Sequence, residues 1–279
     1  MPDPPITNIE IPAVARELLA AYVSGGTIAV PLSARDENFD LNAAYSVEAE
    51  FARLRIESGR TTTGLKVGYA NKAIWRALKL RTLVWAHMYD DTVHHATGTR
   101  AELTLPYYRS PKIEPEIVFK LKEPIMSGGL DAAAVLQHID WIAIGFEIID
   151  CPFPHWQFKP ADFVAAFGFH LALVVGQPRQ IEAEMIPKLI DELGRFRVRL
   201  SKDGQLIEEG SGKNSLRSPA LCVAELAGAL LLQPGAVPLS IGELVSSGTL
   251  TSSYPITRGE VWEVEIGGLP LQNLTLCFK

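Results

Sequence analysis

The chain has 279 residues, of which 47% are hydrophobic and 21% are charged, a balance that excludes a disordered, fibrous or coiled-coil protein. Its 26 Lys and Arg against 32 Asp and Glu give a net charge of −6, so the basic surface that nucleic-acid binding requires is missing. The cysteines Cys151, Cys222 and Cys277 are scattered and form no CxxC motif, which favours a reducing, cytoplasmic compartment.

The first sixty residues are predicted to be mainly helical. Apolar residues recur at helical spacing over residues 11–23 and 42–57, and glycines follow both runs. The polar stretch between them, PLSARDENFD, is typical of a loop. A third, short helix is predicted over residues 70–80. Residues 1–62 are therefore expected to form a helical N-terminal portion.

After about Thr92 the apolar pattern changes to a period of two, which predicts strands. The alternation is clearest over residues 117–121, 196–200, 262–266 and 274–278. Asp203-Gly204 predicts a hairpin turn after the second of these strands.

Two helices are predicted among the strands, over residues 181–193 and 218–232. The second contains Glu225 and is shorter than a membrane span, so no membrane partner is expected. Strands and helices do not alternate regularly. The pattern predicts an α+β fold, with residues 63–279 forming a core around a mixed β-sheet.

Glu114 and Glu116 lie two residues apart on a predicted strand, so their side chains project from one face. Carboxylates that close repel each other unless a cation or a proton lies between them. Pro115 has no N–H and therefore indicates a sheet edge or the start of a strand. The pair is either a functional site or two solvated glutamates on an exposed strand.

Glu147 lies in the apolar run AIGFEII, where a buried carboxylate needs a partner. That partner is either a cation shared with Glu114 and Glu116 or a nearby group such as Asp150. Three carboxylates without histidine or cysteine ligands form an all-oxygen set, which suits Mg²⁺ or Mn²⁺.

The order and spacing of several motifs resemble the fumarylacetoacetate hydrolase superfamily over nearly the whole chain. The closest likeness is to the branch of 2-keto-4-pentenoate hydratases and 4-oxalocrotonate decarboxylases, which act in aromatic degradation. The segments that carry the likeness are AYSVE at 44–48, GLKVG at 64–68, MYDDT at 88–92, IEPEI at 113–117, Glu147 with Trp156, Lys159 and Asp162, SGTLT at 247–251, and GGL at 267–269.

The resemblance implies a fumarylacetoacetate hydrolase-type fold with a metal site at Glu114, Glu116 and Glu147. The metal would chelate a 2-keto or 2-hydroxy-enoic acid and act as a Lewis acid on its 2-oxygen. It further implies a homo-oligomer and a metal-dependent lyase, in first place a hydratase of a 2-hydroxy-2,4-dienoate. The alternatives are a decarboxylase of a 2-oxo-3-enedioate, a C–C hydrolase of an acylpyruvate, and a non-catalytic partner subunit.

The same resemblance supplies expectations for the residues around the metal. Lys66 is expected to transfer protons, assisted by Asp91 or its neighbour Asp90. A nearby cation and partial burial would lower the pKa of Lys66, whereas an Asp91 carboxylate would raise it. Lys159 is expected to contact the substrate or the metal-binding carboxylates. The residues expected to bind substrate are Ser247, Thr249, Thr251 and Asp162. The Ser247–Thr251 segment is equally compatible with an ordinary Ser/Thr turn.

One segment departs from the branch. Where its members continue with small polar residues after the matching aspartate, this chain has AAFGFH at 165–170. Phe167, Phe169 and His170 are expected to lie on a strand and to make the pocket wall more apolar, which would disfavour a dicarboxylic substrate. The alternative is that the aromatic side chains face the core.

Overall fold

Helices dominate the first part of the chain in the computed structural model, which describes residues 7–279. α1 (Ile11–Ser24) and α3 (Leu41–Glu57) lie where helical spacing predicts them, and the Asp40 side chain caps α3 by accepting from the Ala43 N–H. The polar stretch predicted to be a loop contains the one-turn helix α2 (Leu32–Arg35). The predicted domain that begins at residue 1 includes six residues that lie outside the described part.

Two strands that the sequence pattern did not indicate flank the short helix α4 (Lys72–Leu78). They are β1 (Thr62–Gly68) and β2 (Val84–Tyr89), which pair antiparallel. Nearly all of their residues are buried, so apolar and polar positions do not alternate.

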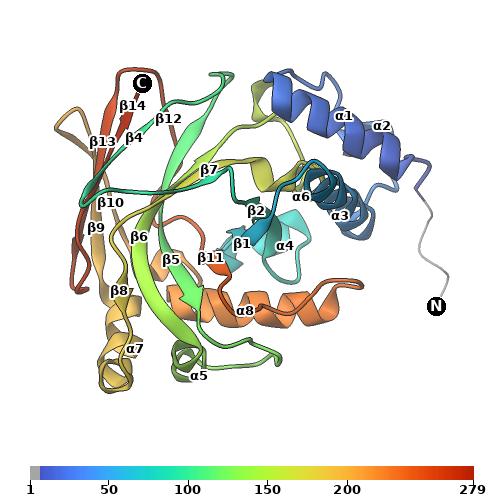
Figure 1. Cartoon of the computed structure of the whole chain (residues 1–279). Coiled ribbons are helices and arrows are strands. Elements are labelled where there is room, and N and C mark those ends of the chain that lie inside the picture. The colour runs from blue at the N-terminus through green and yellow to red at the C-terminus, as the bar shows by residue number, and fades with distance from the viewer. Residues whose placement is uncertain (1–6) are drawn as a thin grey trace.

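A nine-stranded mixed sheet forms the centre of the molecule, with the strand order β2-β1-β11-β5-β6-β7-β3. Figure 1 shows the long, curved β5 (Lys112–Leu121) and β6 (Ile139–Ile149) running through it. Its remaining strands are β11 (Leu244–Ser246), β7 (His170–Val175), β3 (Val93–His95), β12 (Tyr254–Pro255), which pairs with β5, and β8 (Arg179–Gln180), which pairs with β6.

A five-stranded sheet contains most of the strands that alternation predicts. Its order is β10 (Gln205–Ser211), β9 (Arg197–Lys202), β13 (Val261–Gly267), β14 (Leu274–Phe278) and β4 (Arg100–Leu103). β9 and β10 form the predicted antiparallel hairpin around Asp203-Gly204. Alternate residues such as Val198, Leu200 and Val264 are fully buried.

The later helices pack beside and below the central sheet, and α8 (Pro219–Leu232) runs beneath it in Figure 1. The others are α5 (Ala132–Gln137), α6 (Pro160–Ala165) and α7 (Ile186–Arg195), with single turns η1 (Pro154–Trp156), η2 (Phe167–Phe169), η3 (Ala183–Met185) and η4 (Gly212–Asn214). The continuous segment Gly212–Leu232 is long and apolar enough to cross a membrane by length and composition, but 67% of it is buried inside the protein. This burial is typical of a core helix.

Pro115 lies inside β5 rather than at the strand start, but one side of the strand has no partner at this residue, which agrees with the edge expected from sequence. β5 has β6 on one side, where Pro115 pairs with Phe146. On the other side β11 ends opposite Val118 and β12 begins opposite Ile113, so no strand partner faces Pro115 there. The missing N–H therefore costs no ladder hydrogen bond. The connection between β11 and β12 crosses this gap and reaches the carboxylates on β5.

The fold class predicted from the sequence is confirmed: helices come first and a strand-rich mixed sheet follows. One continuous apolar cluster joins the two parts, because Leu18 and Phe51 of the helices belong to the same core as Ile117 of β5. A domain boundary at residue 62 stays a prediction.

Candidate metal and proton-transfer site

Three carboxylates converge on neighbouring strands of the central sheet. Glu114 and Glu116 lie on β5, and Glu147 of β6 pairs directly with Glu114 across the ladder. Residues two apart on a strand and residues opposite each other across a ladder share a face. One carboxylate oxygen of each lies within 4.8 Å of the others. Glu116 and Glu147 are fully buried, and Glu114 is partly buried.

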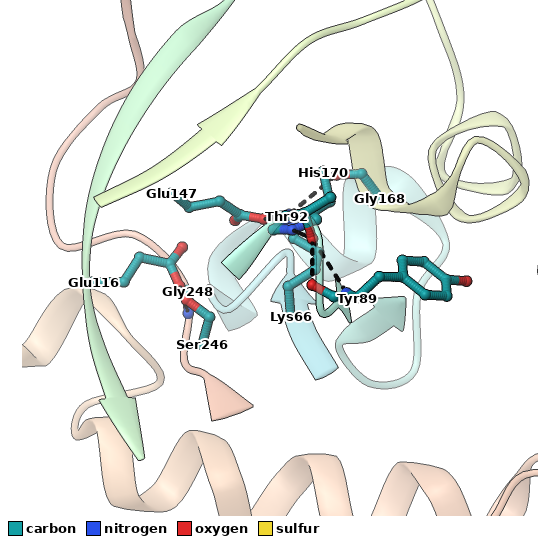
Figure 2. Close-up of polar contacts among 9 residues, drawn as sticks. All are labelled: Lys66, Tyr89, Thr92, Glu116, Glu147, Gly168, His170, Ser246 and Gly248. Carbon is teal, nitrogen blue, oxygen red and sulfur yellow. Dashed lines mark hydrogen bonds and ion pairs between the residues drawn. The ribbon is translucent and has the colours of Figure 1, made fainter. Parts of the chain in front are cut away.

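Hydrogen bonds fix one oxygen of each buried carboxylate. Glu116 Oε2 accepts from the Ser246 hydroxyl at 2.5 Å and from the Gly248 N–H at 2.9 Å. Glu147 Oε1 lies 2.9 Å from His170 Nδ1. Figure 2 shows the Glu116 and Glu147 side chains projecting in the same direction from their strands, with Ser246 and Gly248 beside the first and His170 near the second.

The other oxygens are the ones that fit a cation. Within residues 7–279, Glu116 Oε1 and Glu147 Oε2 are buried without a hydrogen-bond partner, although Lys66 Nζ lies 2.9 Å from Glu147 Oε2. Buried carboxylate oxygens of this kind are costly unless a cation or a proton neutralises them. The all-oxygen donor set matches a hard divalent ion such as Mg²⁺ or Mn²⁺.

Lys66 is the cation at the cluster. It lies on β1 with 1% of its surface exposed, and its Nζ donates to the Gly168 carbonyl at 3.1 Å. Burial by itself lowers the pKa of this ammonium, but attraction to Glu147, Glu114 and Glu116 outweighs burial and raises the pKa. The lowered pKa expected from the sequence depends on a cation beside Lys66 and stays a prediction; with the carboxylates alone as neighbours, the pKa is raised.

The pKa values of two of the carboxylates are raised as well. Burial raises the pKa of Glu114 to about 7, with Lys66 opposing the rise and Glu147 adding to it. Burial and the two neighbouring carboxylates raise the pKa of Glu116 well above its ordinary value. Without a metal ion the carboxylate cluster therefore retains protons near neutral pH.

A cavity of about 700 Å³ opens beside Lys66 and Glu114. Part of its wall is aromatic, formed by Tyr69, Trp156, Phe158, Phe163 and Phe169. The polar part includes Lys112, Asn71, Glu208, Asn214, Thr249, Thr251, Ser252 and Ser253. A small acid bound here would touch the carboxylate cluster at one end and an aromatic wall along its side.

Two residues expected to take part in catalysis lie elsewhere. Asp91 forms ion pairs with Arg55 at 2.5 Å and Arg60 at 3.2 Å, so its carboxylate is committed to two guanidinium groups and does not line the cavity. Lys159 is exposed at the start of α6 and does not line the cavity either. Both placements correct the expected catalytic roles.

Asp162 and Ser247 are structural rather than substrate contacts. The buried Asp162 carboxylate accepts from the Ser33 N–H and hydroxyl at 2.8 and 2.6 Å and from the Lys159 N–H at 2.8 Å. The Ser247 hydroxyl donates to the Ile117 carbonyl at 2.8 Å and anchors the loop that carries Gly248. Of the four residues expected to bind substrate around these motifs, Thr249 and Thr251 line the cavity.

The aromatic stretch is not the expected strand. Phe167–Phe169 forms the single turn η2 with positive φ at all three residues, so a period of two does not apply. Phe167 stacks on Phe51 in the core, with ring centroids 4.3 Å apart, and Phe169 alone of the two phenylalanines lines the cavity.

Asp150, the other group considered as a partner for Glu147, instead pairs with Arg109 at 2.8 Å.

His170 lies behind Glu147 rather than in the cavity wall, which corrects its expected contact with substrate. Its Nε2 lies 3.0 Å from the Thr92 hydroxyl, which also bonds to the Tyr89 backbone (Figure 2). An imidazole held at both nitrogens fixes the orientation of a ligand carboxylate.

Sequence reasoning missed Thr92, Gly168, Ser246 and Lys112. Gly248 lies inside the SGTLT motif and Ser246 directly precedes it, so that motif was an available signal for both. Thr92 and Gly168 lie inside MYDDT and AAFGFH, but their contacts with His170 and Lys66 cross the fold, and the sequence carries no local signal for those contacts.

The chain belongs to the fumarylacetoacetate (FAA) hydrolase family, whose C-terminal model matches residues 66–276 and confirms the resemblance found in the sequence. It is 28% identical to a 2-hydroxyhexa-2,4-dienoate hydratase from Comamonas testosteroni, over 91% of this chain and 92% of that protein. It is 26% identical to a 4-oxalocrotonate decarboxylase from a Pseudomonas species, over 94% of this chain and 96% of that protein. Among solved structures, the fold is similar to 4-oxalocrotonate decarboxylase from Pseudomonas putida G7, complexed with magnesium and adipate. That match has a TM-score of 0.86 at 23% identity and covers 99% of this chain and 100% of that one.

Proposed function

We propose that this protein is a divalent-metal-dependent lyase, a hydratase of a 2-hydroxy-2,4-dienoate or a related 2-keto-enoic acid. The observation that carries the proposal is the cluster of Glu114, Glu116 and Glu147 with Lys66, of which Glu114 and Lys66 line a cavity of about 700 Å³. The curated relatives include hydratases and decarboxylases of such acids, which supports this substrate class.

Glu114, Glu116 and Glu147 would hold Mg²⁺ or Mn²⁺. When bound, the ion supplies a Lewis acid that stabilises negative charge on an oxygen of the substrate. The site is preorganised, because Ser246 and the Gly248 N–H orient the Glu116 carboxylate and His170 orients the Glu147 carboxylate.

Lys66 is the proposed proton-transfer group. Its ammonium lines the cavity, contacts Glu147 and is held by the Gly168 carbonyl, so it can donate a proton to a substrate carbon and take one back from water. A divalent ion on the carboxylates would offset their attraction for the ammonium, which lowers the lysine pKa toward neutrality.

The cavity wall would orient the substrate. Phe163 and Phe169 cover the side of the cavity nearest Lys66, whose Nζ lies 5.0 Å from the Phe163 ring centroid. Thr249 and Thr251 supply polar groups on another part of the wall. A planar dienoate matches such a wall in shape and polarity.

The test is a panel of 2-hydroxydienoates, 2-oxo-3-enedioates and acylpyruvates, assayed with Mg²⁺ and after chelation, with products identified by mass. Water addition that requires Mg²⁺ and falls by at least about a hundredfold in Lys66→Met supports the proposal. Lys120→Met is the control, since Lys120 also lies on a strand of the central sheet and beside an aromatic ring, but outside the cavity.

Other products would indicate other reactions. Loss of carbon dioxide would assign decarboxylation, and cleavage of a C–C bond would assign hydrolysis. Turnover that persists unchanged after chelation, or in Glu116→Gln, contradicts the metal-dependent mechanism. No turnover of any substrate at full Mg²⁺ occupancy favours a partner subunit without catalysis.

Two further features belong to the proposal. A reducing, cytoplasmic compartment is supported by three free, buried cysteines. A homo-oligomer is proposed as well, and size-exclusion chromatography with light scattering measures it.

A further inference from the structure

Lys112 occupies a position in the cavity that the proposed chemistry does not use. It lies on β5 two residues before Glu114, so both side chains project from the same strand face, with Cα atoms roughly 7 Å apart. Lys112 is half-buried and lines the cavity. Lys112 therefore lies in the cavity wall next to the carboxylate cluster.

The charge of Lys112 has no acidic partner. In the described part of the chain, no carboxylate oxygen lies within 4.0 Å of its Nζ. Its ammonium instead lies over the Trp156 ring, 3.8 Å from the centroid. The indole is itself anchored, because Nε1 donates to the Ser110 hydroxyl at 2.8 Å. A cation held over an aromatic face keeps N–H donors available for an anion.

Two other charged groups of the cavity are already engaged. Lys66, the second lysine of the lining, is bound to Glu147 and Gly168. Glu208 accepts from the Ser252 N–H and from the Tyr254 hydroxyl, each at 2.8 Å. The charge of Lys112 acts on the Glu114 carboxylate, which also lines the cavity, but no ion pair joins these two described residues, so the N–H donors of Lys112 are available to an incoming anion.

We propose that Lys112 binds a second, distal carboxylate, so that the preferred substrate is a dicarboxylic 2-keto or 2-hydroxy-enoic acid. This inference rests on the proposed function, because the keto-acid end must lie at Glu114, Glu116 and Glu147 for the far end to reach Lys112. The preference for a monoacid expected from sequence relied on Phe167, Phe169 and His170 lining the pocket. The structure leaves only Phe169 of these three in the lining and supplies a cation in the wall.

The experiment compares two unreactive probes, 2-oxoadipate and 2-oxohexanoate, which differ by a carboxylate in place of a methyl group. Binding is measured by titration calorimetry with saturating Mg²⁺ and again with chelator. The proposal expects 2-oxoadipate to bind at least about tenfold more tightly, which corresponds to about 1.4 kcal/mol. Lys112→Met should remove this difference and change the affinities for 2-oxohexanoate and for Mg²⁺ alone by a few-fold at most, because Lys112 acts on the nearby Glu114 carboxylate only through its charge. Lys120→Met, on the same strand, should behave like the native protein.

Two results would overturn the proposal. Equal affinities of the native protein for both probes would show that no group binds the distal carboxylate. A loss of Mg²⁺ and 2-oxohexanoate binding in Lys112→Met would show that Lys112 serves the carboxylate cluster instead. Failure of the proposed function looks different, because neither keto acid would then bind in a Mg²⁺-dependent way. Lys112→Gln repeats the test if the methionine variant folds poorly.

Discussion

Gly168 offers a sharp test of how the fold holds Lys66. It has φ of 63°, and a Cβ added there would lie 2.7 Å from Lys66 Cδ and 3.2 Å from Ala86 Cβ. Gly98 provides a matched control, since its φ is also 63° but its added Cβ meets nothing within 4 Å. Alanine at either site carries the same backbone penalty, and only Gly168→Ala also pushes against the lysine.

The magnitudes follow from these two contributions. A left-handed conformation costs a residue with a Cβ roughly 1–2 kcal/mol, which is the whole effect expected for Gly98→Ala. Overpacking of a buried site adds roughly 1–3 kcal/mol, so Gly168→Ala should lower the free energy of unfolding by about 2–5 kcal/mol. Lys66 cannot withdraw easily, because it is buried and bound to Glu147 and to the carbonyl of Gly168 itself.

The assay is urea unfolding with chelator present, so that bound metal does not mask the difference, followed by kcat and Mg²⁺ affinity for the variant that folds. Displacement of the ammonium should lower kcat of Gly168→Ala at least tenfold, while Mg²⁺ affinity changes by a few-fold at most. Equal stability losses in the two variants, together with native kcat in Gly168→Ala, would refute the reasoning.

Three further predictions concern the metal. Glu116→Gln should abolish Mg²⁺ binding in calorimetry with near-native circular dichroism, because it removes one anionic ligand and keeps the shape; retained affinity would contradict the ligand assignment. Burial raises the pKa of Glu114 to about 7, so protons compete with the ion below that pH, and Mg²⁺ affinity should fall as pH drops from 8 to 6; a flat profile would count against it. His170→Asn should weaken Mg²⁺ binding by about 10–100-fold through loss of its contact with Glu147, whereas unchanged affinity would leave His170 without a positioning role.

The proposed metal ligands could be predicted from the sequence because their arrangement is local. Residues two apart on a strand share a face wherever the strand lies, which places Glu114 beside Glu116. Glu147 was found because a carboxylate in an apolar run needs a partner. The family resemblance added Lys66, and the structure brings that lysine to the cluster.

Other residues were misplaced because their surroundings come from distant parts of the chain. Asp91 and Asp162 look like site residues by motif, but Arg55 and Ser33 bind them, over sequence separations of 36 and 129 residues. β1 and β2 escaped notice because burial on both faces removes the alternation that reveals a strand.

By itself the sequence determined the helical first part, the strands that are apolar on one side and the carboxylate triad, since each depends on spacing along a single element. The tertiary structure decided which groups surround that triad. It turned Phe167 into the core, set His170 behind Glu147 and left Lys112 in the cavity over Trp156. The physical reason is that burial and charge pairing depend on which strands and loops become neighbours, and local periodicity does not encode those pairings.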